Sequence, residues 1–175
     1  MDLSIFHPKV VHFAVALLLT YSLLEIIGVL FNNAFFQKTA LLILLLGVLG
    51  AFAAVTTGRE AEDAFDYFNS SSSDTMESHE TFANITFWFF LIVLLFRGTL
   101  MVNVKLRDYF YKIRYVFLIL AIIGAFFVFQ TGQYGGELVY THGIGTKIKI
   151  QQMENKIKSE QPADTEKNEE KENEK

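Results

Sequence analysis

Residues 13–31 read FAVALLLTYSLLEIIGVLF, a run of 19 residues with a single charged side chain, Glu25. A run of this length matches the ~20 apolar residues that a helix needs to cross the ~30 Å hydrocarbon core of a bilayer. Similar runs follow at residues 40–57, 82–102 and 113–131. The 175-residue chain is 51% hydrophobic and 15% aromatic, which is typical of a small integral membrane protein in contact with the lipid bilayer.

The fold class predicted from these runs is an all-α membrane protein with four transmembrane helices. We expect the spans at about residues 10–31, 39–58, 81–102 and 112–132, within one transmembrane domain of residues 1–150. Residues 151–175 contain no aromatic residue and are rich in Glu, Lys and Asn. Such a segment cannot bury enough apolar surface to fold, so we expect a disordered, charged tail.

The two halves of the chain resemble each other. A shift of 74 residues relates Gly50-Ala51-Phe52 and Thr57-Gly58 to Gly124-Ala125-Phe126 and Thr131-Gly132. At the front of each half, a shift of 72 residues relates His7 to His79. The repeat predicts a bundle of two duplicated helical hairpins that lie side by side in the same orientation.

The same shift of 72 residues relates Glu25 to Arg97, which places opposite charges at equivalent depths of the first and third spans. An isolated charge in hydrocarbon costs about 2.5–3.5 kcal/mol on insertion scales. We therefore predict a Glu25–Arg97 ion pair that faces the bundle interior. It can act as a packing clamp or as a proton or ion relay, and a single pair favours the clamp.

All four histidines fall at one end of the predicted bundle. His7 precedes the first span, His12 lies about 7.5 Å further along that helix and should reach the bundle mouth, and His79 opens the third span. His142 follows the fourth span in a glycine-rich segment, residues 135–145, that can fold back over the bundle. Imidazole is the common protein ligand of metals and haem iron, so this clustering predicts a shared site.

Small residues on the second and fourth spans follow helical spacing toward the same end. Gly50 and Gly58 lie on one span, and Gly124 and Gly132 on the other. Close helix–helix approach is the usual reason for such strips, and room for a porphyrin is the alternative. Because the chain has no cysteine, any haem must be held non-covalently, as haem b.

Three functions stay open on these residues. The first is a haem b electron carrier or redox-associated subunit, with Arg59 near the propionates. The second is a site for a single Cu, Zn or Fe ion. The third is a structural or assembly subunit without a cofactor. No nucleophile, acid–base or nucleic-acid-binding motif accompanies the histidines, so we expect no enzymatic turnover and no nucleic-acid partner.

Charge bias predicts the orientation. Basic residues crowd the end of the third span, the connection after it and the start of the fourth span: Arg97, Lys105, Arg107, Lys112 and Arg114. Residues 58–81 carry seven acids and one basic residue, Arg59. By the positive-inside rule, both termini and the histidines should face the outer, periplasmic side.

The combined motifs resemble a family of predicted bacterial membrane proteins that is catalogued as a domain of unknown function. The resemblance covers residues 6–145 and rests on four motifs: His7-Pro8-x-x-Val11-His12-Phe13, Thr57-Gly58, His79, and TGxxGGxLVYxHGxG from Thr131 to Gly145. Ala14 stands where relatives typically carry proline. The resemblance implies a four-span domain of the bacterial inner membrane, with a c-type cytochrome or respiratory complex as a partner.

Overall fold

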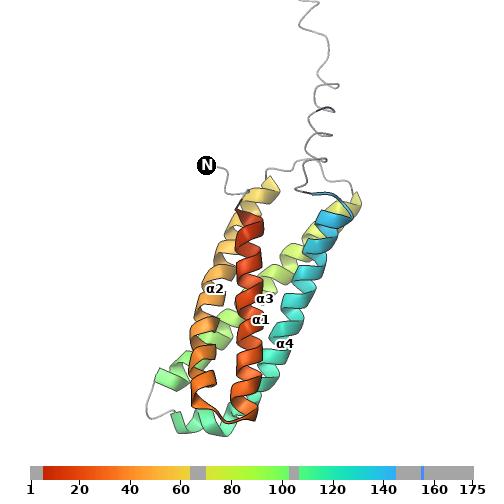
Figure 1. Ribbon diagram of the computed structural model, residues 1–175. Helices are drawn as coiled ribbons and strands as arrows, with labels where there is room; N and C mark the ends of the chain where they lie inside the picture. Colours follow the sequence, from red (N-terminus) through yellow and green to blue (C-terminus); the bar gives the residue numbers. More distant parts are fainter. Residues whose placement is uncertain (1–5, 64–69, 103–106, 145–154, 156–175) are drawn as a thin grey trace, which may run out of the picture. The chain divides into compact units, whose positions relative to one another are not determined.

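A computed structural model of the chain describes residues 6–63, 70–102, 107–144 and 155. They form four helices: α1 (His7–Leu30), α2 (Ala34–Asp63), α3 (Ser70–Val102) and α4 (Arg107–Tyr140) (Figure 1). Each helix is long and apolar enough to cross a membrane. The predicted four-span, all-α membrane fold is confirmed. The predicted disordered tail lies outside the described residues, except for Asn155.

The helices extend beyond the predicted spans, most of all at the histidine-bearing ends. α3 begins at Ser70 rather than near residue 81, so His79 lies within the helix and does not open it. α4 continues through Gly135 and Gly136 to Tyr140, where a separate, folded-back segment was expected. Glycine in a helix costs only about 1 kcal/mol relative to alanine, and an unbroken helix keeps the backbone groups bonded at the edge of a bilayer.

The chain divides into two compact units, Met1–Gly135 and Gly136–Lys175. In the first unit, α1 and α3 run in one direction and α2 and α4 in the other (Figure 1). The starts of α1 and α3 therefore share an end of the unit with the later turns of α2 and α4. We call this the histidine end, and define it by His7, Thr57, His79 and Thr131.

A tight turn at residues 31–33 joins α1 to α2. Asn32 adopts a left-handed conformation with φ of 48°, which asparagine tolerates better than most residues. The Asn33 side chain accepts a hydrogen bond of 2.9 Å from the backbone N–H of Phe35 and so caps the start of α2. The turn closes the first hairpin at the end opposite the histidines.

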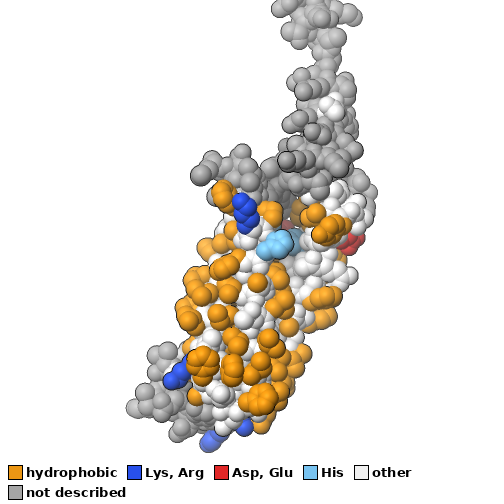
Figure 2. Space-filling model, viewed as in Figure 1, with side chains coloured by type: hydrophobic (Ala, Val, Ile, Leu, Met, Phe, Trp, Pro, Cys, Tyr) orange, Lys and Arg blue, Asp and Glu red, His pale blue; other side chains and the backbone are white. Residues whose placement is uncertain are grey.

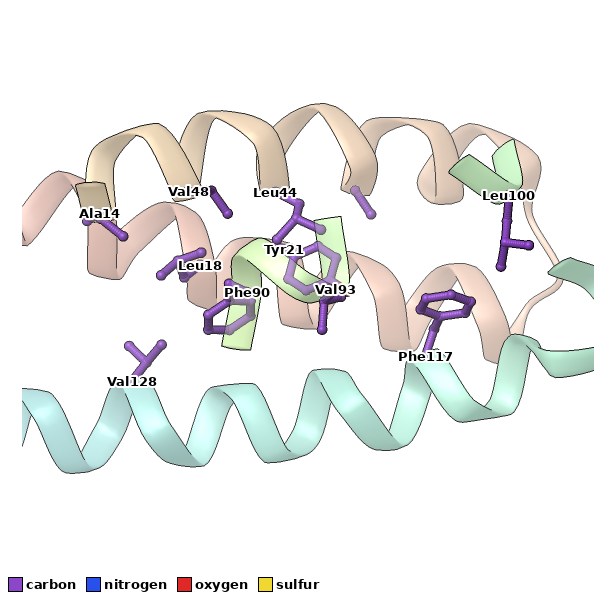
Figure 3. Close-up of a cluster of buried hydrophobic side chains, with 12 residues drawn as sticks. Ala14, Leu18, Tyr21, Leu44, Val48, Phe90, Val93, Leu100, Phe117 and Val128 are labelled. Carbon is purple, nitrogen blue, oxygen red and sulfur yellow. The ribbon is translucent and has the colours of Figure 1, made fainter. Parts of the chain in front are cut away.

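The core of the first unit receives side chains from all four helices (Figure 3). Tyr21 of α1 meets Phe90 of α3 edge to face, with 5.9 Å between ring centroids. Leu44 of α2 and Phe117 of α4 are fully buried in the same cluster. Because each helix contributes to one interior, packing fixes the depth at which residues of different helices meet.

Apolar side chains cover most of the helical face seen in Figure 2. Large side chains such as Leu23, Ile92 and Phe129 are more than half exposed. A soluble monomer rarely exposes a continuous apolar surface of this extent, whereas a bilayer solvates it. The exposed apolar band is therefore the lipid-facing surface of the protein.

Candidate functional site

His7 packs across the first hairpin against the last turns of α2. Its Nδ1 lies 3.1 Å from the hydroxyl oxygen of Thr57. The Thr57 hydroxyl donates its proton to the carbonyl of Ala53, at 2.8 Å, so it can only accept from the imidazole. The Nδ1 of His7 therefore carries the proton, and Nε2 carries a lone pair.

Gly58 provides the space for this ring. A Cβ atom at Gly58 would lie 3.1 Å from Cε1 of His7 and 3.6 Å from Nδ1. A larger residue would push the imidazole away from Thr57. Gly58 thus makes room for a flat group, the side chain of His7, and its predicted place beside a porphyrin stays a prediction.

His79 repeats this arrangement in the second hairpin. Its Nδ1 lies 3.0 Å from the carbonyl oxygen of Thr131 on α4. A carbonyl only accepts, so Nδ1 of His79 donates and Nε2 again carries the lone pair. Gly135 provides the space here, because a Cβ at that position would lie 3.1 Å from Cε1 of His79.

The two halves differ in which atom of the repeated threonine holds the imidazole. The Thr131 hydroxyl donates to the carbonyl of Phe127 at 2.9 Å and lies 3.0 Å from the hydroxyl of Thr86. It is thereby engaged within α4 and with α3, and the backbone carbonyl receives His79 instead. Thr57 and Thr131 were visible in the sequence as repeat markers and Gly135 as part of the glycine-rich motif, whereas nothing in the pattern distinguished Thr86.

Both imidazoles leave the same atom available. The hydrogen bonds of His7 to Thr57 and of His79 to Thr131 are both made through Nδ1, and neither uses Nε2. In many metal sites, the ligating histidine donates one ring N–H to a protein oxygen and binds the metal through the other nitrogen. His7 and His79 have this orientation, with Nδ1–H bonded and Nε2 carrying the lone pair.

His12 lies outside the bundle mouth, contrary to the prediction from its depth along the helix. It is exposed, and its Nδ1 is bonded to the carbonyl oxygen of Pro8 on its own helix. At about 100° per residue, five positions rotate His12 by about 140° around α1 from His7. The two histidines of α1 therefore cannot face the same point.

His142 belongs to the second unit, where it follows the end of α4. Its backbone N–H donates to the carbonyl of Glu137 at 3.2 Å, and Gly143 has a φ of 68°, as in a helix-terminating turn. The convergence of His142 with the other histidines stays a prediction. Among the described residues, no group of three or more His, Asp or Glu side chains is placed to hold a metal ion.

The other predicted cofactor residues have different surroundings. A Cβ at Gly50 would lie 3.4 Å from Cα of Ala14, and one at Gly124 would lie 2.5 Å from Cζ of Phe90. These two glycines therefore allow close helix packing. A Cβ at Gly132 would meet no described atom within 4 Å, and the Arg59 side chain is exposed.

The ion pair that the repeat predicted is present toward the opposite end of the bundle. Arg97 Nη1 of α3 contacts Oε2 of Glu25 of α1, and both side chains are 0% exposed. Arg97 also donates from Nη2 to the carbonyl of Gln37 on α2, at 2.7 Å. Its Cζ lies 5.9 Å from the ring centroid of Tyr21 and 6.0 Å from that of Phe117. One guanidinium thus joins all four helices.

The hydrogen bond of His7 can be tested by substitution of its partner. Replacing Thr57 with valine keeps the shape but removes the acceptor, and we expect a loss of about 1 kcal/mol of stability with a change of the His7 tautomer. Thr57→Ser should preserve both. Nitrogen-15 NMR of labelled histidine reports the tautomer, and an unchanged His7 signal in Thr57→Val would contradict the assignment.

Residues 4–148 match the model of a family described as "Predicted membrane protein (DUF2231)". No curated protein and no solved structure matches the chain. Because the match covers most of the sequence, the chain belongs to this family of predicted membrane proteins.

Proposed function

We propose that this member of the DUF2231 family is a redox-associated membrane subunit that holds one metal centre between Nε2 of His7 and Nε2 of His79. The observation that carries the proposal is the matched state of the two imidazoles. Each donates Nδ1–H to a protein oxygen of the neighbouring helix, at 3.1 and 3.0 Å, and leaves Nε2 available. Neutral imidazole with a fixed tautomer is a ligand for iron, copper and zinc.

Haem b is the first candidate for this centre. Haem iron accepts axial imidazoles, and helical bundles hold cofactors through side chains of facing helices. His7 and His79 occupy equivalent positions of the two hairpins, so they suit haem, whose two faces are equivalent. An electron carrier needs no acid–base groups beyond these ligands, which agrees with the absence of a catalytic motif from the sequence.

A single Cu, Zn or Fe ion is the second candidate, and a specific observation favours it. Gly50, Gly58 and Gly124 lie against Ala14, His7 and Phe90, so the small-residue strips are filled by the protein's own side chains. A compact ion needs no such strip. Two imidazoles would supply part of its coordination and leave positions open for further ligands.

The proposal also sets the location. Basic residues between the third and fourth spans favour the cytoplasmic side, which places the histidine end at the periplasmic face of a bacterial inner membrane. A centre at that face suits exchange with a c-type cytochrome or a respiratory complex. Since the chain has no cysteine, single cysteines introduced at either end can be labelled with a membrane-impermeant maleimide to test the orientation.

The decisive experiment is an absorption spectrum and elemental analysis of the full-length protein extracted from membranes. A Soret band that shifts on reduction identifies haem b, and stoichiometric copper, zinc or iron without that band identifies an ion. Either centre should be lost in His7→Ala and in His79→Ala and kept in His12→Ala, because His12 points elsewhere. Protein with neither centre, or loss in His12→Ala but not in His79→Ala, would contradict the proposal and favour a structural or assembly subunit.

A further inference from the structure

The interior ion pair carries an inference that does not depend on the metal centre. We propose that Glu25 is a proton-binding group inside the membrane, held between Arg97 of α3 and Tyr21 of α1. Glu25 and Tyr21 are both 0% exposed and lie one helical turn apart on α1. At 1.5 Å per residue, Glu25 lies about 27 Å along α1 from His7, so the two sites are separate.

The carboxylate is only partly engaged. Arg97 contacts Oε2 through Nη1, whereas Oε1 has no hydrogen-bond partner among the described residues. A pair that serves only as a clamp gains most from the bidentate geometry, in which both oxygens accept from one guanidinium. The second oxygen of Glu25 is therefore available to receive a proton.

The Tyr21 hydroxyl is the second unsatisfied group. It is fully buried, and Arg97, which acts on it, can only donate, so the hydroxyl proton has no acceptor among the described residues. Buried polar atoms without partners are rare and call for a specific explanation such as an ordered water or a functional role. A protonated Glu25, directly or through one water, would donate to the Tyr21 oxygen, which an ionised carboxylate cannot do.

Arg97 does not depend on Glu25 for its position. Its Nη2 donates to the carbonyl of Gln37, and its guanidinium lies over the rings of Tyr21 and Phe117. If Glu25 takes a proton, the cation keeps an acceptor and two aromatic faces. The pair can therefore open without leaving a bare buried charge, which is the usual penalty for breaking such a contact.

The groups around the Glu25–Arg97 pair come from all four helices. Arg97 of α3 is the one charged group that acts on it in the described chain, and Tyr21 of α1 is the other titratable one. α2 contributes Gln37, whose side-chain amide already donates to the carbonyl of Gly28 at 3.0 Å, and α4 contributes Phe117. In the proposed step, a proton from water forms an O–H bond at Oε1, no bond breaks, and Arg97 keeps its charge.

Infrared difference spectroscopy of the full-length protein in lipid vesicles tests this step. Lowering the bulk pH protonates exposed carboxyl groups as well, so the Glu25 band is the separate carbonyl stretch of a buried carboxyl group, at higher frequency than theirs and shifted to lower frequency in D₂O. The band should disappear in Glu25→Gln and persist in Glu60→Gln, which neutralises an exposed acid at the end of α2. Tyr21→Phe should keep the band but move its frequency, because the hydroxyl partner is gone.

Two results would overturn the proposal. One is a band that persists unchanged in Glu25→Gln. The other is the absence of any such band while circular dichroism reports native helix content. If Glu25→Gln does not fold, Glu25→Asp provides the test, because it keeps a carboxyl group in a new position. A band of unmoved frequency in Glu25→Asp would assign the proton to another residue.

Discussion

Replacing Arg97 with leucine should lower the free energy of unfolding by about 3–5 kcal/mol, the usual result of removing one partner from a buried ion pair. The change leaves Glu25 unpaired at 0% exposure and removes the hydrogen bond from Nη2 to Gln37. It also removes the cation from between the rings of Tyr21 and Phe117. Unfolding in mixed detergent micelles, followed by circular dichroism, measures the loss.

Two further variants separate the ion pair from a general effect of losing arginine. Arg114→Leu removes a partly exposed arginine that bonds to Asn32 and to the hydroxyl of Tyr115, and should cost no more than about 1 kcal/mol. Combining Glu25→Leu with Arg97→Leu should be milder than Arg97→Leu alone, because no charge then lies unpaired. A double variant less stable than both single variants would contradict this account of the pair.

The second large effect is expected at Gly124, where Gly124→Ala should destabilise the bundle by about 1–3 kcal/mol through overpacking. The added Cβ would lie 2.5 Å from Cζ and 2.8 Å from Cε1 of Phe90, and 3.0 Å from Cε1 of Phe89. Phe90 is 0% exposed and meets Tyr21 edge to face, so it has little room to move. The free energy of unfolding in the same micelle assay measures the effect.

Gly132→Ala is the matched control on the same helix. A Cβ at Gly132 meets no described atom within 4 Å, so the substitution should leave stability unchanged or raise it by up to about 1 kcal/mol, the helix preference of alanine over glycine. Equal destabilisation by the two alanines would mean that Gly124 is needed for something other than its contact with Phe90.

The sequence predicted the Glu25–Arg97 pair for a physical reason. A charge in hydrocarbon needs a partner, and the repeat places these two residues at the same depth. It also identified Thr57 and Thr131, which hold His7 and His79. It misplaced His12, because the depth of a residue along a helix was considered without its rotation about the axis. The expectation that the chain leaves the helix at Gly135 was wrong, because glycine content alone does not end a helix.

Apolar run length and the internal repeat are properties of the chain itself, and they determined the four spans, the two hairpins and the interior ion pair. Only the tertiary structure decided which histidines pack against a neighbouring helix. It also decided that Gly135, and not Gly132, lies beside His79, and that Gly124 contacts Phe90 closely. Lengthwise position follows from counting residues, whereas rotation and contact across helices depend on how the interior side chains pack together.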